Sequence, residues 1–108
     1  EKQVSTEHIE PATMKDVFKN EFLIGAAVND YLISESDSIG AQLVKREYNT
    51  ITPENSMKWE HMEPEKGVFQ FKTSDSYVDF SKKNNIAFIG HNLVWHSQLS
   101  SWVEEIES

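Results

Sequence analysis

Strand-like and helix-like segments alternate along this chain, and the alternation narrows the folds that it can adopt. Apolar or β-branched runs begin near residues 22, 48 and 86, and such runs favour strands. Between them, residues 36–47 and 73–85 space their apolar side chains as amphipathic helices do. A β-α-β-α-β order builds parallel sheets with right-handed crossovers. The sequence therefore predicts an α/β fold.

The three predicted strands have clear boundaries in the sequence. The run FLIGAAV at residues 22–28 is apolar on both faces, which is typical of a strand that is covered on both sides. Residues 48–52 form the second predicted strand, which stops at Pro53 because proline cannot donate a hydrogen bond to a ladder. Residues 86–90 form the third strand, which we expect to continue as far as Trp95.

The remaining segments are more polar. We expect residues 1–12 to be a mobile leader, and a short helix to follow over residues 14–20 with Thr13 as its N-cap. Residues 54–71 are polar and contain proline and glycine, so they are predicted to form a long loop. A loop of this length after a strand is usually functional or disordered.

Composition and charge exclude several classes of function. The 108 residues make at most one domain, and ten Lys and Arg against eighteen Asp and Glu give a net charge of −8. This charge repels the phosphates of nucleic acids and anionic lipid surfaces. No apolar run approaches the roughly 20 residues that a membrane span requires. Without cysteine, no thiolate metal site is expected, and without a phosphate-binding glycine loop or an H-E-x-x-H motif we expect no cofactor.

Two polar clusters follow predicted strands. They are ITPENSMKW at residues 51–59 and GHNLVWHSQ at residues 90–98. Ligands of parallel α/β proteins bind at the carboxyl ends of the strands. The two clusters are therefore the candidate binding residues.

The first cluster has two interpretations. Glu54 and Lys58 are four residues apart, which is the spacing of a weak surface ion pair. Alternatively Glu54, Asn55 and Lys58 supply donors and acceptors for a ligand rich in hydroxyl groups. The neighbouring Trp59 could be a sugar platform, but the usual burial of large aromatic side chains favours the core.

The second cluster is equally open to a binding or a structural role. His91 and His96 are five positions apart. On a strand an odd difference in position sends two side chains to opposite faces, which argues against a shared metal. His91 and Trp95 would share a face and could line a pocket together. A hydrogen-bonded core histidine packed against a tryptophan explains them as well. Gln98 has no signal of its own.

Taken together, these motifs resemble family-ten glycoside hydrolases, the endo-1,4-β-xylanases. The resemblance rests on the two clusters, on EPEKGVFQF at residues 63–71 between them, and on the first apolar run, and it covers about residues 14–103, nearly the whole chain. Two departures are visible. Asn92 stands where threonine is common, and Ser100 and Ser101 stand where a proline often precedes the tryptophan.

The resemblance implies a fold and a reaction. The fold would be a (β/α)8 TIM barrel, of which this chain would form the three N-terminal βα units, and the reaction would be hydrolysis of internal bonds in xylan with retention of configuration. Glu54, Asn55 and Lys58 match residues that hold xylose units on the non-reducing (glycone) side of the cleaved bond. The remaining matches are His91 and Trp95 at the subsite of the cleaved sugar, Gln98 as a further glycone contact, and His96 within the motif.

The resemblance also places the catalytic residues outside this chain. A retaining glycosidase needs two carboxyl groups about 5 to 5.5 Å apart, and this family carries them on the fourth and seventh strands. In this family the acid/base glutamate follows an asparagine at the end of the fourth strand. Asn20 and Glu21 have the same order, but they precede the first predicted strand. We therefore expect no catalytic residue here and continuation of the domain beyond Ser108.

Partners and location follow from the same resemblance. They would be xylan or arabinoxylan, xylo-oligosaccharides and the C-terminal remainder of the domain, in an extracellular, periplasmic or cell-surface protein. Two other classes stay open. A non-catalytic sugar-binding fragment would lack the two glutamates in its continuation, and a small acidic interaction domain has no motif in its favour.

Overall fold

A computed structural model describes residues 11–106 of the chain. The predicted leader lies almost wholly outside this range. The elements, in chain order, are α1 (Met14–Val17), β1 (Gly25–Val28), α2 (Asp30–Ile33), α3 (Ser38–Glu47), β2 (Thr50–Pro53), α4 (Trp59–Met62), α5 (Lys72–Lys83), β3 (Ala87–Phe88) and α6 (Ser101–Glu104). No helix within this range is long and apolar enough to cross a membrane.

The three strands form one parallel sheet in the order β1-β2-β3. The register pairs Ala26 with Ile51, and Ile51 with Phe88. Sequential parallel strands with helices between them are the βαβ arrangement that the sequence predicts. The α/β class is therefore confirmed.

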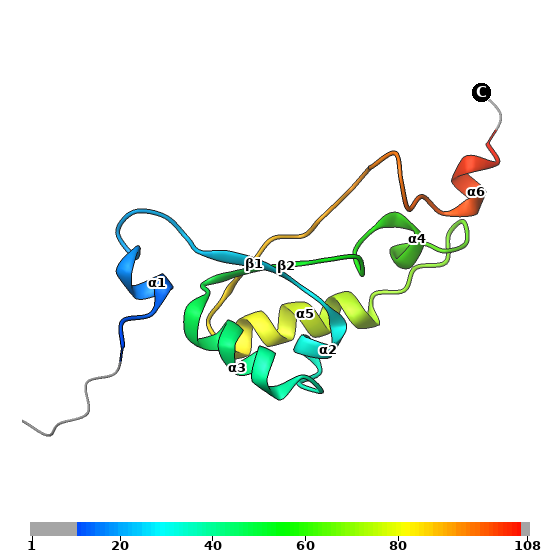
Figure 1. Cartoon of the computed structure of the whole chain (residues 1–108). Helices are drawn as coiled ribbons and strands as arrows, with labels where there is room; N and C mark the ends of the chain where they lie inside the picture. Colours follow the sequence, from blue (N-terminus) through cyan, green and yellow to red (C-terminus); the bar gives the residue numbers. More distant parts are fainter. Residues whose placement is uncertain (1–10, 107–108) are drawn as a thin grey trace, which may run out of the picture.

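The core lies between the sheet and the helices on one of its faces. Figure 1 shows α2, α3 and α5 together on this side of the strands. Both the sheet and the helices contribute buried side chains, which are Val28, Val44, Ile51, Tyr77, Phe80 and Ile86. Ile51 and Tyr77 are fully buried. Each Å² of apolar surface removed from water stabilises the fold by about 25 cal/mol. This stabilisation is concentrated where β2 meets α5.

The opposite side of the sheet is not covered within the described residues. Ala27 and Ala87 are exposed at strand positions, and Ile89 is 54% exposed just after β3. The expectation that the first strand is covered on both faces is therefore wrong for these 96 residues taken alone. Side chains that point into a barrel need the remaining strands to cover them.

Two strand boundaries also differ from the expectation. Residues 22–24 are not part of β1, and Phe22 and Leu23 are exposed. β2 begins later than predicted and includes Pro53. The amide groups of Thr50 and Glu54 donate to the β1 side, to the carbonyls of Ile24 and Val28. By alternation the nitrogen of Pro53 faces the other way, past the end of β3, so its missing N–H leaves no ladder bond unmade.

The third strand is shorter than predicted. β3 spans only Ala87–Phe88, with one further ladder bond from the Ile89 amide to the Ile51 carbonyl at 3.0 Å. The predicted extension to Trp95 is wrong. β2 ends at Pro53, so the chain after Ile89 has no strand beside it within the described residues and leaves the sheet as an irregular segment.

The predicted loop over residues 54–71 contains a short helix, α4, and is held by the start of α6 and the residue before it. Ser100 is buried, and its hydroxyl donates to the carbonyls of Trp59 and Glu63 at 3.1 and 2.6 Å. The Trp102 indole donates to the Glu63 carbonyl at 3.0 Å and meets the Trp59 ring edge-on at 5.8 Å. The loop is therefore ordered by contacts that are distant in sequence.

Helix caps explain where α1, α2 and α3 begin. The side chains of Thr13, Asn29 and Asp37 accept hydrogen bonds from backbone amides in the first turns of these helices. Side-chain oxygens at this position satisfy amides that a helix leaves free. The N-cap predicted at Thr13 is confirmed, although α1 ends at Val17 rather than Asn20.

Candidate functional site

Asn55 is the centre of a hydrogen-bonded cluster just beyond the carboxyl end of β2. Its side-chain Oδ1 accepts from the Lys58 ammonium at 2.9 Å and from the Gln98 Nε2 at 3.1 Å. These bonds join the two polar clusters across 43 positions of sequence. Because both bonds use the amide oxygen, the Nδ2 group of Asn55 keeps its two donors for a ligand.

Lys58 lies between this amide and an aromatic ring. Its Nζ lies 4.8 Å from the centre of the Trp95 ring, which is within the range of a cation–π contact. Trp95 in turn meets His96 edge-on, with ring centres 5.2 Å apart. The charge of Lys58 is thus held beside a flat apolar surface, which is the combination that suits a sugar ring.

Glu54 does not form the ion pair that its spacing with Lys58 suggested. Within residues 11–106 the two side chains make no salt bridge with each other. Glu54 is anchored through its backbone, whose amide donates to the Val28 carbonyl at 2.9 Å, and its side chain is exposed. The carboxylate is therefore available as an acceptor for ligand hydroxyls.

Gln98 is held in place by its backbone as well as by Asn55. It has a positive φ of 53°, and its carbonyl accepts from the Glu60 amide at 3.1 Å. Its side-chain Oε1 is buried with no hydrogen-bond partner in the described part of the chain. The Gln98 amide thus acts in the cluster as a donor toward Asn55.

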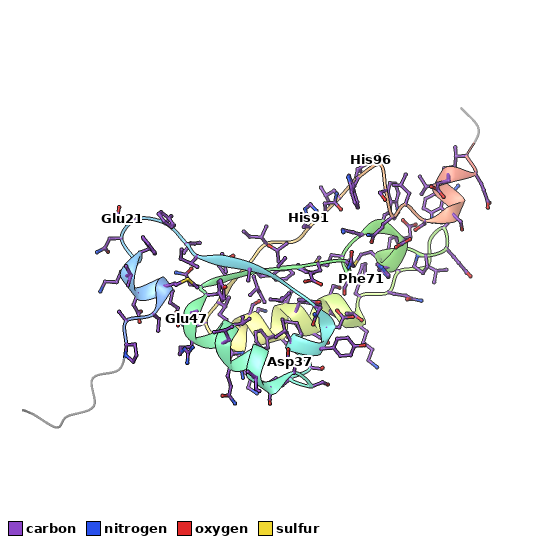
Figure 2. The ribbon with its side chains drawn as sticks, in the orientation of Figure 1. Glu21, Asp37, Glu47, Phe71, His91 and His96 are labelled. Atoms are coloured by element: carbon purple, nitrogen blue, oxygen red, sulfur yellow. The ribbon has the colours of Figure 1, made fainter. Side chains whose placement is uncertain are left out.

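His91 lies apart from this cluster. It lines a small apolar hollow of about 300 Å³ together with Met57 and Trp59, and Trp95 is not among the residues that line it. Figure 2 shows His91 and His96 on the segment that leaves β3 and runs toward α6. The prediction that His91 and Trp95 share a strand face is wrong, because this segment is not a strand.

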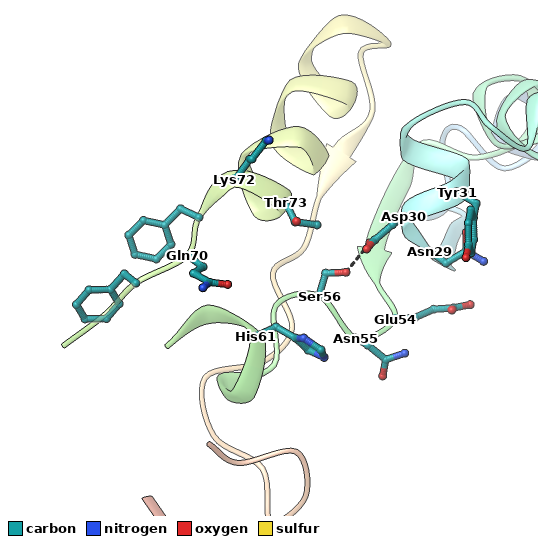
Figure 3. A pocket seen from close by; sticks show the side chains of 12 residues that line it. Asn29, Asp30, Tyr31, Glu54, Asn55, Ser56, His61, Gln70, Lys72 and Thr73 are labelled. Atoms are coloured by element: carbon teal, nitrogen blue, oxygen red, sulfur yellow. Dashed lines mark hydrogen bonds between the residues drawn. The ribbon is translucent and has the colours of Figure 1, made fainter. Parts of the chain in front are cut away.

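A larger hollow of about 870 Å³ lies beside Glu54 and Asn55. In Figure 3, Asn29, Tyr31 and Glu54 lie on one side of it and Gln70 on the other, with His61 below. Sequence reasoning missed these neighbours. Asn29 and Tyr31 follow the carboxyl end of β1, so the rule that selected the two clusters would have found them, whereas His61 and Gln70 have no such signal.

The described residues do not bring three histidine or carboxylate side chains close enough to hold a metal ion. The donors and acceptors that they do gather are the ammonium of Lys58, the amides of Asn55 and Gln98 and the carboxylate of Glu54. Side chains of these types form hydrogen bonds with the hydroxyl groups of an uncharged ligand. The arrangement is a candidate carbohydrate-binding surface at the carboxyl edge of a parallel sheet.

The fold and this edge define the class of protein. The chain belongs to glycosyl hydrolase family 10, whose family model matches residues 13–108. The family fold is the TIM barrel, and the described residues supply three of its parallel strands without closing it.

Individual relatives agree with this assignment. Endo-1,4-beta-xylanase A of Caldicellulosiruptor sp. (strain Rt8B.4) is 47% identical over 85 residues, which are 79% of this chain and 12% of that protein. The beta-1,4-xylanase of Dictyoglomus thermophilum is 42% identical over 95 residues, 88% of this chain and 26% of that protein. The chain therefore spans about a quarter or less of the length of these two relatives.

A solved structure gives the same result in three dimensions. Xylanase 10B from Thermotoga petrophila RKU-1, in complex with xylobiose, superposes with a TM-score of 0.85 at 33% identity. The match covers 94% of this chain and 32% of that one. The three strands and their helices thus correspond to the N-terminal part of the family domain.

The buried Tyr77, whose hydroxyl contacts Asp30 at the larger hollow, makes the stability depend on alkaline pH. Burial of the phenol, and then its hydrogen bond to Asp30, raise the pKa of Tyr77 well above the usual value. The folded protein therefore keeps the proton after an unfolded chain has lost it near pH 10. Stability is fully present below that pH and falls above it, by at most about 1.4 kcal/mol per pH unit.

We expect urea denaturation of the complete domain to show this loss between pH 9 and 11. A Tyr77→Phe variant should lose less stability than the parent over the same interval, and Tyr31→Phe, at a position where the ring is 70% exposed, should behave like the parent. Parallel curves for the parent and Tyr77→Phe would contradict the expectation.

Proposed function

We propose that this chain is the glycone-binding part of an endo-1,4-β-xylanase that hydrolyses internal bonds of xylan with retention of configuration. The single observation that carries the proposal is the Asn55 cluster, in which Lys58 and Gln98 both donate to the amide oxygen of Asn55 and the Lys58 ammonium lies over the Trp95 ring. Its free donors, together with the Glu54 carboxylate, match the alternating donors and acceptors of sugar hydroxyls.

The roles within the site divide between two positions along the substrate. Glu54, Asn55, Lys58 and Gln98 would hold the xylose units on the glycone side, and His91 and Trp95 would line the place where the ring is cleaved. His96, in the same motif, would either contact the sugar or support the residues that do. The family relationship to xylanases and the placement at the strand ends support this division. The acid/base and nucleophilic carboxylates, which retention requires about 5 to 5.5 Å apart, would come from later strands of the domain.

The substrates that this role implies are xylan or arabinoxylan and their oligosaccharides. Action on polymeric xylan, as opposed to short oligosaccharides taken up by a cell, would place the protein in an extracellular, periplasmic or cell-surface location. The net charge of −8 also suits a neutral substrate better than a polyanionic one.

Two aryl glycosides separate the proposed roles experimentally. An aryl β-xylobioside occupies one glycone site beyond the cleaved ring, whereas an aryl β-xyloside occupies only the cleaved position. We define the glycone ratio as kcat/KM for the xylobioside divided by kcat/KM for the xyloside. In the complete domain, Glu54→Ala and Lys58→Ala are expected to lower this ratio. The decrease should correspond to a free energy of about 1 to 3 kcal/mol, the cost of leaving a polar partner unpaired.

Matched controls are available on the same chain. Glu21 and Lys82 are exposed and precede the amino ends of β1 and β3, at the opposite edge of the sheet from the candidate site, so Glu21→Ala and Lys82→Ala should leave the glycone ratio at the parental value. Parental ratios for Glu54→Ala and Lys58→Ala would contradict the glycone assignment.

A further inference from the structure

A buried hydroxyl below the Asn55 cluster connects three elements. Tyr77 lies on α5 and is fully buried, with its ring 6.4 Å from that of Phe88. Its OH group donates to the Asp30 Oδ1 at 2.6 Å and lies 3.3 Å from the Val28 carbonyl. The phenol therefore reaches through the core to the carboxyl end of β1.

Asp30 carries this connection to the binding loop. The same Oδ1 atom accepts a hydrogen bond from the hydroxyl of Ser56, which Figure 3 shows as a dashed line. Ser56 directly follows Asn55. One carboxylate oxygen thus joins α5, the start of α2 and the loop that carries the glycone-binding residues.

We propose that Tyr77, Asp30 and Ser56 form a positioning network that sets the glycone-binding loop after β2. None of the three is assigned a contact with substrate, so they are positioning residues rather than catalytic ones. The inference rests on the proposed function, because the loop matters for catalysis only if Glu54 and Asn55 hold the glycone.

The geometry favours positioning over simple core packing. The buried ring of Tyr77 supplies the packing, whereas the hydroxyl meets a carboxylate whose residue is exposed at the edge of the hollow. The backbone of the loop is tied to β1 by the bond from the Glu54 amide to the Val28 carbonyl. Without the Ser56 bond, the loop beyond Glu54 loses its side-chain connection to the first βα unit.

The test uses the complete domain and the glycone ratio defined above. Tyr77→Phe keeps the ring and removes only the hydroxyl, and Ser56→Ala removes the other side of the network. Each is expected to lower the ratio by about 3- to 10-fold, the effect of one hydrogen bond. Ser56→Thr keeps a hydroxyl at the same position and should restore most of the ratio.

Tyr48→Phe is the matched control. Tyr48 is the C-cap residue of α3, at the opposite end of β2 from the binding loop, and it is half-buried. Its variant should show the parental ratio. Thermal unfolding of each variant checks that the domain is folded. If Tyr77→Phe does not fold, the glycone ratio of Ser56→Ala tests the network instead.

Three outcomes would overturn the proposal. Equal losses on both glycosides for Tyr77→Phe and Ser56→Ala would show a structural role only. A lowered ratio for Glu54→Ala with parental ratios for Tyr77→Phe and Ser56→Ala would reject the network but keep the glycone assignment. Parental ratios for Glu54→Ala, Lys58→Ala, Tyr77→Phe and Ser56→Ala would reject the glycone assignment and the network with it.

Discussion

Residues 1–108 on their own are expected to release no reducing sugar from xylan. Both carboxylates of the retaining mechanism are proposed to lie on later strands, and a single misplaced carboxylate cannot act as both acid/base and nucleophile. The three strands also leave the sheet unclosed, with Phe22, Leu23 and Ile89 more than half exposed. On this proposal the chain would lack the reacting groups, and its three described strands form an open sheet without the cover that a closed barrel would give.

The measurement compares the isolated chain with the complete domain at equal molar concentration. The complete domain is the positive control, and adding the remaining strands as a separate fragment should restore some activity. Release of reducing sugar by residues 1–108 alone would contradict the placement of the catalytic carboxylates. A complete domain that binds xylan without hydrolysing it would favour the non-catalytic sugar-binding alternative.

The largest expected loss of stability comes from Ile51→Ala. Ile51 is fully buried in the central strand, where it is paired in register with Ala26 of β1 and Phe88 of β3. Truncating it removes apolar contacts and leaves a cavity that close neighbours on both sides cannot fill. The free energy of unfolding of the complete domain should fall by about 2 to 5 kcal/mol.

Ile39→Ala is the matched control for this substitution. Ile39 lies in the first turn of α3 and is 82% exposed. The same chemical change there should alter the free energy of unfolding by no more than about 0.5 kcal/mol. Equal effects of the two substitutions in urea denaturation would show that β2 is not the centre of the core.

The parts of the fold that the sequence predicted are those decided by local patterns. The helix over α3 and the helix over α5 were found because their apolar residues recur at helical spacing over 10 and 12 residues. α4 and α6 have four residues each, which is too short for such a pattern. α2 carried a usable signal, because Asn29 caps it, but a single capping residue was not enough to predict a helix.

The length of β3 could not be read from its residues. The apolar run continues past Phe88, but a strand needs a neighbour, and β2 ends at Pro53 while no fourth strand is present in the described residues. A strand boundary of this kind depends on residues elsewhere in the fold.

The candidate site shows the same division. Its location at the strand ends followed from the topology, which the sequence predicted. The internal arrangement did not follow, because Trp95 and Gln98 lie on an irregular segment where alternation of faces no longer holds. The choice of Asn55, rather than Glu54, as the partner of Lys58 is likewise decided by loop geometry.

The order of the strands in the sheet matters for how such a protein is made on the ribosome. Each strand pairs with the one synthesised before it, so β2 and β3 can add to the growing sheet as they emerge, with little loop-closure entropy. β1 is different, because its free edge can be covered only when the last strand of the barrel arrives. The first of the three strands is therefore the last to be fully paired, and until then its edge is open to pairing with another chain.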